Sequence, residues 1–417
     1  MIFKRILSSK AGKSGLVYTF TNFFNAALPF LLLPIITTYL SEEEYGIATM
    51  IMVFVSVMTP LITLGITSSI SVVYFNKEIK DFPQYIGNCL IMVFGSVFAT
   101  LIIFQLFSST IESFSGIPSN WVSTIVLIVL FNFIIEINLL TYKVRFKSKS
   151  FALIKISQTL LTFILSYYLI AIEDLNWEGL ILAKLIVLSS FALLSLILLY
   201  KGKFVKIIFN KSHIKYAVLF GLPLVPHLLS AFIVNLSDRM FITNYLGLAE
   251  TGSYTVSYQI GSILDLLCIS INLAWAPWLY SKLENFKQNK PLLKKVTTLG
   301  ILAIIAVAII LILFVPLILN IFISDKFRIS EFLIMLIVIG FAFQGFYLVF
   351  VNYLFYLKKT KEISAVTVFV ALVNLGLNFI LIPQFGVIGA AYATLISFVI
   401  KATIIAFIVN KKYPLYG

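Results

Sequence analysis

The chain has 417 residues, of which 60% are hydrophobic and only 12% are charged, and its formal net charge is +14. A typical soluble domain carries about a quarter charged residues, so this composition excludes a water-soluble globular enzyme, a disordered chain and a coiled coil. In a soluble protein such an excess of Lys and Arg would indicate nucleic acid, whereas in a membrane protein it usually encodes orientation.

Long apolar stretches follow one another along the whole chain. A helix that crosses a bilayer needs about 20 consecutive, mostly apolar residues. Twelve stretches meet this requirement, at 15–38, 45–73, 86–108, 121–142, 150–171, 179–200, 215–244, 252–276, 296–320, 330–356, 363–382 and 387–409. The segments between them are short, so we expect an all-α integral membrane protein without a sizeable soluble domain.

The positive charges alternate from one side of these spans to the other. If the N-terminus is cytoplasmic, 25 of the 31 lysines and arginines fall in cytoplasmic segments, and only Lys326 and Arg328 fall in outer ones. Because Lys and Arg are enriched in cytoplasmic loops, this distribution predicts that both termini are cytoplasmic. Most of the positive charge therefore reports topology, and we expect no nucleic-acid partner.

An internal repeat divides the chain into halves. Residues 36–49 and 242–255 are identical at seven of fourteen positions, at an offset of 206 residues. Six predicted spans fit within this offset, and an even number of spans preserves orientation, so the repeat is parallel. We predict two six-helix lobes, 1–205 and 206–417, related by a pseudo-two-fold axis around a central cleft. This is the architecture of an alternating-access transporter.

Three segments resemble a known family. They are Leu28–Gly46 (LPFLLLPIITTYLSEEEYG), Gly221–Tyr254, with a Pro-bearing helix followed by Ser-Asp-Arg and Gly-x-Tyr, and Leu377–Thr394 (LNFILIPQFGVIGAAYAT). Together, in this order, they are similar to the Wzx-type polysaccharide and O-antigen repeat-unit flippases of the multidrug/oligosaccharidyl-lipid/polysaccharide exporter superfamily. The resemblance implies translocation of a polyprenyl-pyrophosphate-linked oligosaccharide from the cytoplasmic to the outer leaflet of the bacterial plasma (inner) membrane. It also implies contact with membrane lipids and other polysaccharide-assembly membrane proteins, without a cofactor.

A few ionisable side chains lie at bilayer depth, where an uncompensated charge costs several kcal/mol. They are Glu136, Lys155, Lys184, His227, Asp238, Arg239, Asp265 and Lys401. Many relatives carry arginines in the first two helices, whereas residues 15–38 here carry no charge. If a pyrophosphate binds, other cations must hold it, and we assign this role to Lys155, Lys184 and Lys401.

Each of these lysines has an alternative role. Glu136 and Lys155 flank one inner turn at equal depth, so they predict either a structural ion pair or a pair that opens for an anionic head group. Lys184 either extends to the outer surface or faces the cleft as an anchor in the first lobe. Lys401 lies deeper in the last span, where extension to the surface is harder.

The remaining groups belong to the second half of the chain. Asp238 and Arg239 are adjacent, so they point about 100° apart and we expect each to have its own partner, in an outer gate or inter-lobe contact together with Glu136. Asp265 either binds a coupling cation or proton, or pairs with Arg239 or Lys401. His227 follows two prolines that we expect to bend its helix, and it is either a second coupling candidate or a hydrogen-bonded core residue.

Two other functions compete with the flippase. A multidrug extruder of organic cations would favour acidic residues at depth, whereas cations here slightly outnumber acids. A membrane-embedded polysaccharide polymerase would be expected to have a large outer loop with basic residues, and the predicted outer segments are short and nearly free of arginine. We find no HExxH, DxD, GxSxG or P-loop motif, and expect neither catalysis nor a metal site.

Overall fold

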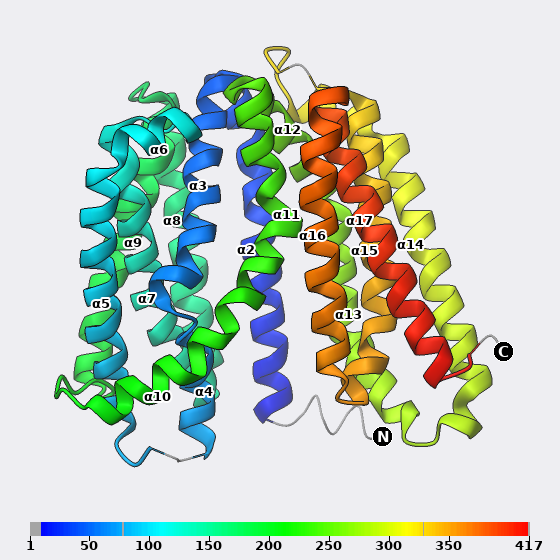
Figure 1. The fold of residues 1–417 in the computed structure, drawn as a ribbon, viewed down its shortest axis with the longest axis horizontal. Helices are drawn as coiled ribbons and strands as arrows, with labels where there is room; N and C mark the ends of the chain where they lie inside the picture. The colour runs from blue at the N-terminus through cyan, green and yellow to red at the C-terminus, as the bar shows by residue number, and fades with distance from the viewer. Residues whose placement is uncertain (1–9, 77–78, 328, 416–417) are drawn as a thin grey trace. The chain divides into compact units, whose positions relative to one another are not determined.

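The computed structural model describes residues 10–76, 79–327 and 329–415, and all regular secondary structure within them is helical (Figure 1). The helices of the first half are α2 (Lys10–Tyr39), α3 (Glu42–Thr63), α4 (Thr67–Asn76), α5 (Phe82–Leu106), α6 (Ser108–Ser115), η1 (Ser119–Trp121), α7 (Val122–Val144), α8 (Ser148–Ala171), α9 (Asn176–Lys201) and α10 (Lys211–Gly221). Those of the second half are η2 (Leu222–Leu224), α11 (Val225–Leu246), α12 (Leu248–Gly261), α13 (Ile263–Leu283), α14 (Phe286–Phe322), α15 (Glu331–Tyr356), α16 (Thr360–Phe385) and α17 (Val387–Lys412).

Eleven of the described helical segments are long and apolar enough to cross a membrane. A bent pair, Lys211–Ser230 and Phe232–Leu246, forms a twelfth span where the sequence predicts one at 215–244. The short 3₁₀ turn η2 interrupts this span at Pro223, as expected for a residue that lacks a backbone donor. The predicted all-helical membrane fold is therefore confirmed, with up to twelve spans.

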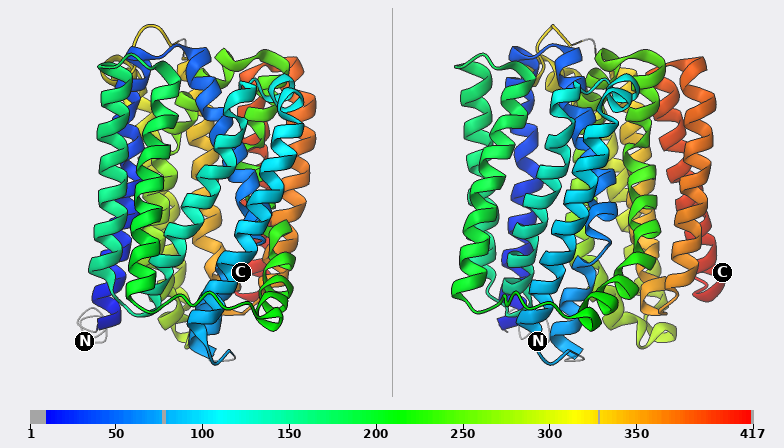
Figure 2. Two further views of the ribbon diagram at one scale, coloured as in Figure 1. Left: turned by 90° about the vertical axis from the view of Figure 1, so that its left-hand side faces the viewer. Right: turned by 60° about the vertical axis from the view of Figure 1, so that its left-hand side comes forward.

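The structure divides into two compact units. The first comprises the residues up to Ile35 together with Ile47–Leu229, and the second comprises Ile36–Gly46 together with the chain from Ser230 onward. In the first unit α9 packs against both α7 and α8, and in the second α17 packs against α15 and α16 (Figures 1 and 2). The chain therefore passes from one unit to the other within the bent span. The lobe boundary expected at residue 205 lies in the loop between α9 and α10 and stays a prediction.

The two copies of the sequence repeat contact each other within the second unit. A Cβ added to Gly46 would lie well inside van der Waals contact of the Leu248 carbonyl oxygen, and a Cβ added to Gly252 would meet the Glu42 carbonyl oxygen in the same way. The offset of 206 residues relates Gly46 to Gly252 and Glu42 to Leu248, so the contact is reciprocal. Glycine is needed at both positions because two backbones approach so closely.

Side-chain hydrogen bonds position the start of α3 in this crossing. Ser41 and Glu44 form a capping box, in which the Glu44 carboxylate accepts from the Ser41 backbone N–H at 2.7 Å and the Ser41 hydroxyl accepts from the Glu44 N–H at 3.2 Å. The Ser253 hydroxyl then donates to the Glu42 carboxylate at 2.6 Å. The sequence run of Glu42, Glu43 and Glu44 thus starts a helix where acidic residues complement its dipole.

We expect Gly46→Ala and Gly252→Ala to destabilise the protein by roughly 1–3 kcal/mol each, because the new methyl group would overlap a backbone carbonyl that cannot move without its helix. Thermal unfolding of the purified full-length protein in detergent measures this loss as a lower apparent Tm. Gly376→Ala on α16 is the matched control, since open space surrounds a Cβ at that position. Equal Tm values for all three variants would contradict the close crossing.

Candidate functional site

Two of the predicted anchors, Lys155 and Lys184, come together in the first unit. Lys155 lies on α8 and Lys184 on the adjacent α9, and both side chains are half-buried. The Lys184 ammonium group lies 3.2 Å from Met52 Sδ and within electrostatic range of Lys155. Across the residues that the structure describes, no carboxylate lies within 4.0 Å of either ammonium group. The anion-binding role assigned to these two lysines from the sequence stays a prediction.

The predicted ion pair between Glu136 and Lys155 is wrong. Glu136 is exposed on α7, and none of the four ion pairs in the described part of the chain includes it. Equal depth is not enough to bring the side chains together, because α7 and α8 both pack mainly against α9 rather than against each other. Lys155 is therefore left without the acid that would have made it structural.

Neutral polar groups from α2 and α8 lie beside Lys155. Asn25 on α2 and Thr159 on α8 share a short hydrogen bond, and Thr159 follows Lys155 by one helical turn. Among the described residues, the Gln158 Oε1 and Tyr18 hydroxyl oxygens are buried without a hydrogen-bond partner. An incoming donor or acceptor, such as a sugar hydroxyl, would satisfy them. The sequence analysis missed these residues, although the positions of Tyr18 and Asn25, two helical turns apart, place them on the same face of α2.

Asp238 and Arg239 form a closed ion pair in the interior of the second unit. Arg239 Nη1 lies 2.6 Å from Asp238 Oδ1, and both side chains are only 3% exposed. The Tyr254 hydroxyl donates to Asp238 Oδ2 at 2.6 Å, and the guanidinium lies over the Tyr258 ring at 4.0 Å. Arg239 also donates to the Asn235 carbonyl oxygen at 2.8 Å. Each residue therefore has a partner of its own, as expected, but the two also pair with each other, because the long guanidinium side chain folds back to its neighbour.

Lys401 and Asp265 form a looser pair elsewhere in this unit. Lys401 on α17 is 6% exposed, and its ammonium group lies over the Tyr347 and Phe398 rings at 4.6 and 4.7 Å. Its side chain is therefore held inside the unit and does not extend to the surface. Asp265 on α13 lies within electrostatic range of Lys401 but not within 4.0 Å, and no described group donates to its buried Oδ1. Of the two partners predicted for Asp265, Lys401 is the neighbour.

A buried amide and hydroxyl network connects α11, α16 and α17 in the same unit. Asn374 Nδ2 donates to Ser397 Oγ at 3.1 Å, and Asn374 Oδ1 accepts from Asn378 at 3.0 Å and from Ser237 at 3.5 Å. Ser237 immediately precedes Asp238, and Ser397 lies one turn before Lys401. The network thus runs between the closed pair and the looser one. The sequence analysis did not find it, although the asparagines have i, i+4 spacing.

His227 lies on the surface of the first unit. Its side chain is exposed near the start of α11. The described residues contain no group of three or more His, Cys, Asp or Glu side chains that could hold a metal ion. The charged groups of interest are thus the lysine pair in the first unit and the two acid–base pairs in the second.

Comparison with known proteins shows the family of the chain. The family model described as "Polysaccharide biosynthesis protein" matches residues 11–283, more than half of the chain. The chain belongs to this family. An uncharacterized membrane protein of Haemophilus influenzae is 27% identical over 394 residues, which cover 91% of this chain and 94% of the relative. A Shigella flexneri protein described as a candidate O-antigen transporter is 24% identical over 180 residues, 43% of each chain.

Solved structures place this polysaccharide biosynthesis family member in the fold of the MOP superfamily. An inward-facing multidrug resistance transporter of the MATE family, itself a MOP transporter, matches with a TM-score of 0.75 at 14% identity and covers 94% of both chains. The lipid II flippase MurJ matches with a TM-score of 0.75 at 18% identity and covers 95% of this chain and 87% of its own. The predicted resemblance to this superfamily is confirmed, and at these identities the structures establish the fold alone.

We expect Arg239→Met to destabilise the protein by roughly 3–5 kcal/mol, because it leaves Asp238 charged and buried without its partner. The double variant Asp238→Asn/Arg239→Met should recover part of this loss. Lys206→Met is the control: it breaks the exposed ion pair with Asp81 and should cost less than about 1 kcal/mol. Apparent Tm values measure all three, and an Arg239→Met protein as stable as Lys206→Met would contradict the closed pair.

Proposed function

We propose that this protein moves a polyprenyl-pyrophosphate-linked oligosaccharide from the cytoplasmic to the outer leaflet of a bacterial plasma membrane. The membership of a polysaccharide transporter family within the MOP superfamily supports a transport role. The observation that carries the choice of cargo is the Lys155–Lys184 pair, which has no carboxylate within 4.0 Å among the described residues. A pyrophosphate carries enough negative charge to compensate both ammonium groups.

The physical task explains why these charges are needed. A pyrophosphate cannot cross hydrocarbon because the loss of its hydration is too costly. Lys155 and Lys184 would replace part of that hydration with charge-assisted hydrogen bonds, each worth about 1.5–3 kcal/mol. The polar groups of Tyr18, Asn25 and Gln158 would bind sugar hydroxyls. The two helical lobes would then expose the bound head group to one side of the membrane at a time, by alternating access.

The same observation argues against export of organic cations. A cationic drug would be repelled by the lysine pair in the first unit, and of the two acids expected at bilayer depth in the second unit, Asp238 is paired with Arg239 and Asp265 lies near Lys401. Structural similarity to a multidrug transporter reflects the shared fold. The first unit therefore favours an anionic cargo.

We expect Lys155→Gln and Lys184→Gln each to reduce transport of the lipid-linked sugar by about tenfold or more, the effect of losing one charge-assisted hydrogen bond. Lys155→Arg keeps the charge and should retain most activity. Flipping in proteoliposomes, with protein amounts matched, measures the rates. Lys206→Gln, which changes an exposed loop lysine of the same unit, is the control. Full activity in both glutamine variants would contradict the proposed anion site.

The looser pair in the second unit supports a role in ion coupling. Lys401 from α17, Tyr258 from α12 and Cys268 from α13 are the charged or titratable groups within electrostatic range of Asp265. Because no described group donates to the buried Asp265 Oδ1, a proton or a cation could bind there while Lys401 balances the charge. We propose that this binding drives the transport cycle.

We expect transport by the wild-type protein to respond to an imposed sodium gradient, pH gradient or membrane potential, and Asp265→Asn to abolish that response. The amide cannot take up a proton or attract a cation as a carboxylate does. Proteoliposomes with each gradient imposed separately provide the measurement. Asp174→Asn, which changes an exposed acid between α8 and α9, should behave as wild type. A wild-type rate that is indifferent to all three gradients would remove the coupling role.

A further inference from the structure

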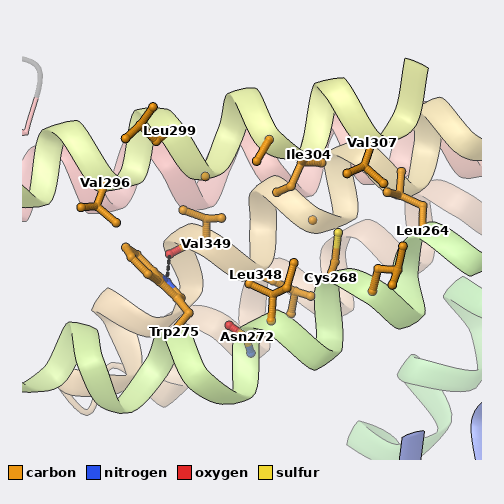
Figure 3. A pocket seen from close by; sticks show the side chains of 15 residues that line it. Leu264, Cys268, Asn272, Trp275, Val296, Leu299, Ile304, Val307, Leu348 and Val349 are labelled. Carbon is orange, nitrogen blue, oxygen red and sulfur yellow. Dashed lines mark hydrogen bonds between the residues drawn. The ribbon is translucent and has the colours of Figure 1, made fainter. Parts of the chain in front are cut away.

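A pocket outside both charged sites opens among α13, α14 and α15 of the second unit (Figure 3). Its volume is about 340 Å³, and its walls are almost entirely aliphatic, with Leu264, Ile304 and Val307 among the residues that line it. An apolar cavity of about 150 Å³ is large enough to stay dry and bind a benzene-sized molecule. This pocket therefore has room for a considerably longer apolar ligand.

Two polar groups of the pocket, the Trp275 ring N–H and the Asn272 side-chain oxygen, are already hydrogen-bonded within the protein. Trp275 Nε1 donates to the Val349 carbonyl oxygen at 3.1 Å, which Figure 3 shows as a dashed line. Asn272 Oδ1 accepts from Asn352 Nδ2 at 2.7 Å. Because these groups bond within the unit, they offer little to a polar ligand. The apolar walls of the pocket therefore favour a hydrocarbon ligand.

One wall of the pocket belongs to an unusually apolar and exposed span. Among the candidate spans of the described chain, α14 has the highest mean hydropathy, 3.4, and the smallest buried share, 11%. Leu267, Ile271 and Leu299 line the pocket and are also exposed on the surface of the unit. The pocket is thus continuous with an exposed apolar surface of the unit, which we expect the bilayer to cover, so an apolar occupant would enter from the bilayer.

One glycine of the pocket leaves open space beside α14, whereas a second allows close packing of α15 against its neighbours. A Cβ added to Gly300 on α14 would meet no atom within 4 Å, whereas one added to Gly345 on α15 would lie 2.8 Å from Cys268 Sγ. The space at Gly300 suits a chain with methyl branches better than a straight acyl chain, which needs less width. On α13, Leu264 at the pocket directly precedes Asp265, so one helix carries both an apolar and an ionisable site.

We propose that this pocket binds part of the isoprenoid chain of the cargo lipid. The proposal rests on the proposed function, since it assigns the tail of the same amphiphile whose head group is assigned to the first unit. The tail is then held by the protein instead of being free in the bilayer. A bilayer phospholipid is the competing occupant, and the experiment is designed to separate the two.

Photo-crosslinking of the full-length protein in nanodiscs tests the assignment. The probe is a polyprenyl phosphate with a diazirine on its isoprenoid chain, and mass spectrometry of peptides locates the label. We expect labelling of α13 and α14, competition by unlabelled polyprenyl phosphate, and no competition by an equal excess of phosphatidylglycerol. Gly300→Leu, which fills the open space, should lower this labelling about tenfold, a loss of roughly 1.4 kcal/mol. Gly300→Ala should have a smaller effect in the same direction.

Gly376→Leu on α16 is the matched control, because a Cβ there also meets open space but the residue lies outside the pocket. Equal competition by phosphatidylglycerol, or labelling that Gly300→Leu leaves unchanged, would overturn the proposal. The labelling measures binding and needs no transport, so it is separable from the proposed function. If Lys184→Gln loses flipping but Gly300→Leu leaves the labelling unchanged, only the tail site is rejected. If the pocket is labelled specifically but the protein does not flip the lipid, only the flippase function is rejected.

Discussion

Charge that leaves water without compensation is the most costly feature that a membrane-spanning chain can contain. The second unit compensates Asp238 and Arg239 fully, with a direct ion pair, a tyrosine hydroxyl and a backbone carbonyl. The first unit leaves Lys155 and Lys184 within range of each other without a nearby acid among the described residues. A buried charge whose partners all belong to the protein stabilises the fold. A charge that lacks such partners needs water or a ligand to compensate it. This difference is the basis for treating Asp238 and Arg239 as structural and for proposing that Lys155 and Lys184 bind the cargo.

The sequence predicts features that depend on one helix at a time. A stretch of about 20 apolar residues defines a span by itself, and the 206-residue repeat reappears as the reciprocal crossing of Gly46 and Gly252. Contacts between side chains of different helices cannot be predicted in this way, because they depend on how each helix is rotated about its own axis. Glu136 and Lys155 share a depth, but the packing of α9 against both of their helices keeps them unpaired.

Neutral polar residues explain most of what the sequence does not show. An asparagine or threonine lowers the mean hydropathy of a span only slightly, and its importance depends on a partner far along the chain. Asn25 and Thr159 are 134 residues apart, and Ser237 and Asn374 are 137 residues apart. Asp238 and Arg239 are neighbours on a helix, and their side chains leave the helix in different directions, which suggests separate partners. The guanidinium side chain is nevertheless long enough to reach the neighbouring carboxylate, and the two form an ion pair.

The two units also differ in how an ion would affect them. In the first, two ammonium groups repel each other, so any anion that bound between them would lower the energy of both lysines. In the second, Asp265 and Lys401 carry opposite formal charges and lie within electrostatic range, so one bound proton or metal cation would leave the pair with a net positive charge. A ligand shifts a conformational equilibrium only by its difference in affinity for the two states. Under the proposed function, the anionic head group would therefore act on the first unit and the coupling ion on the second, and neither would need to bind at the other's site.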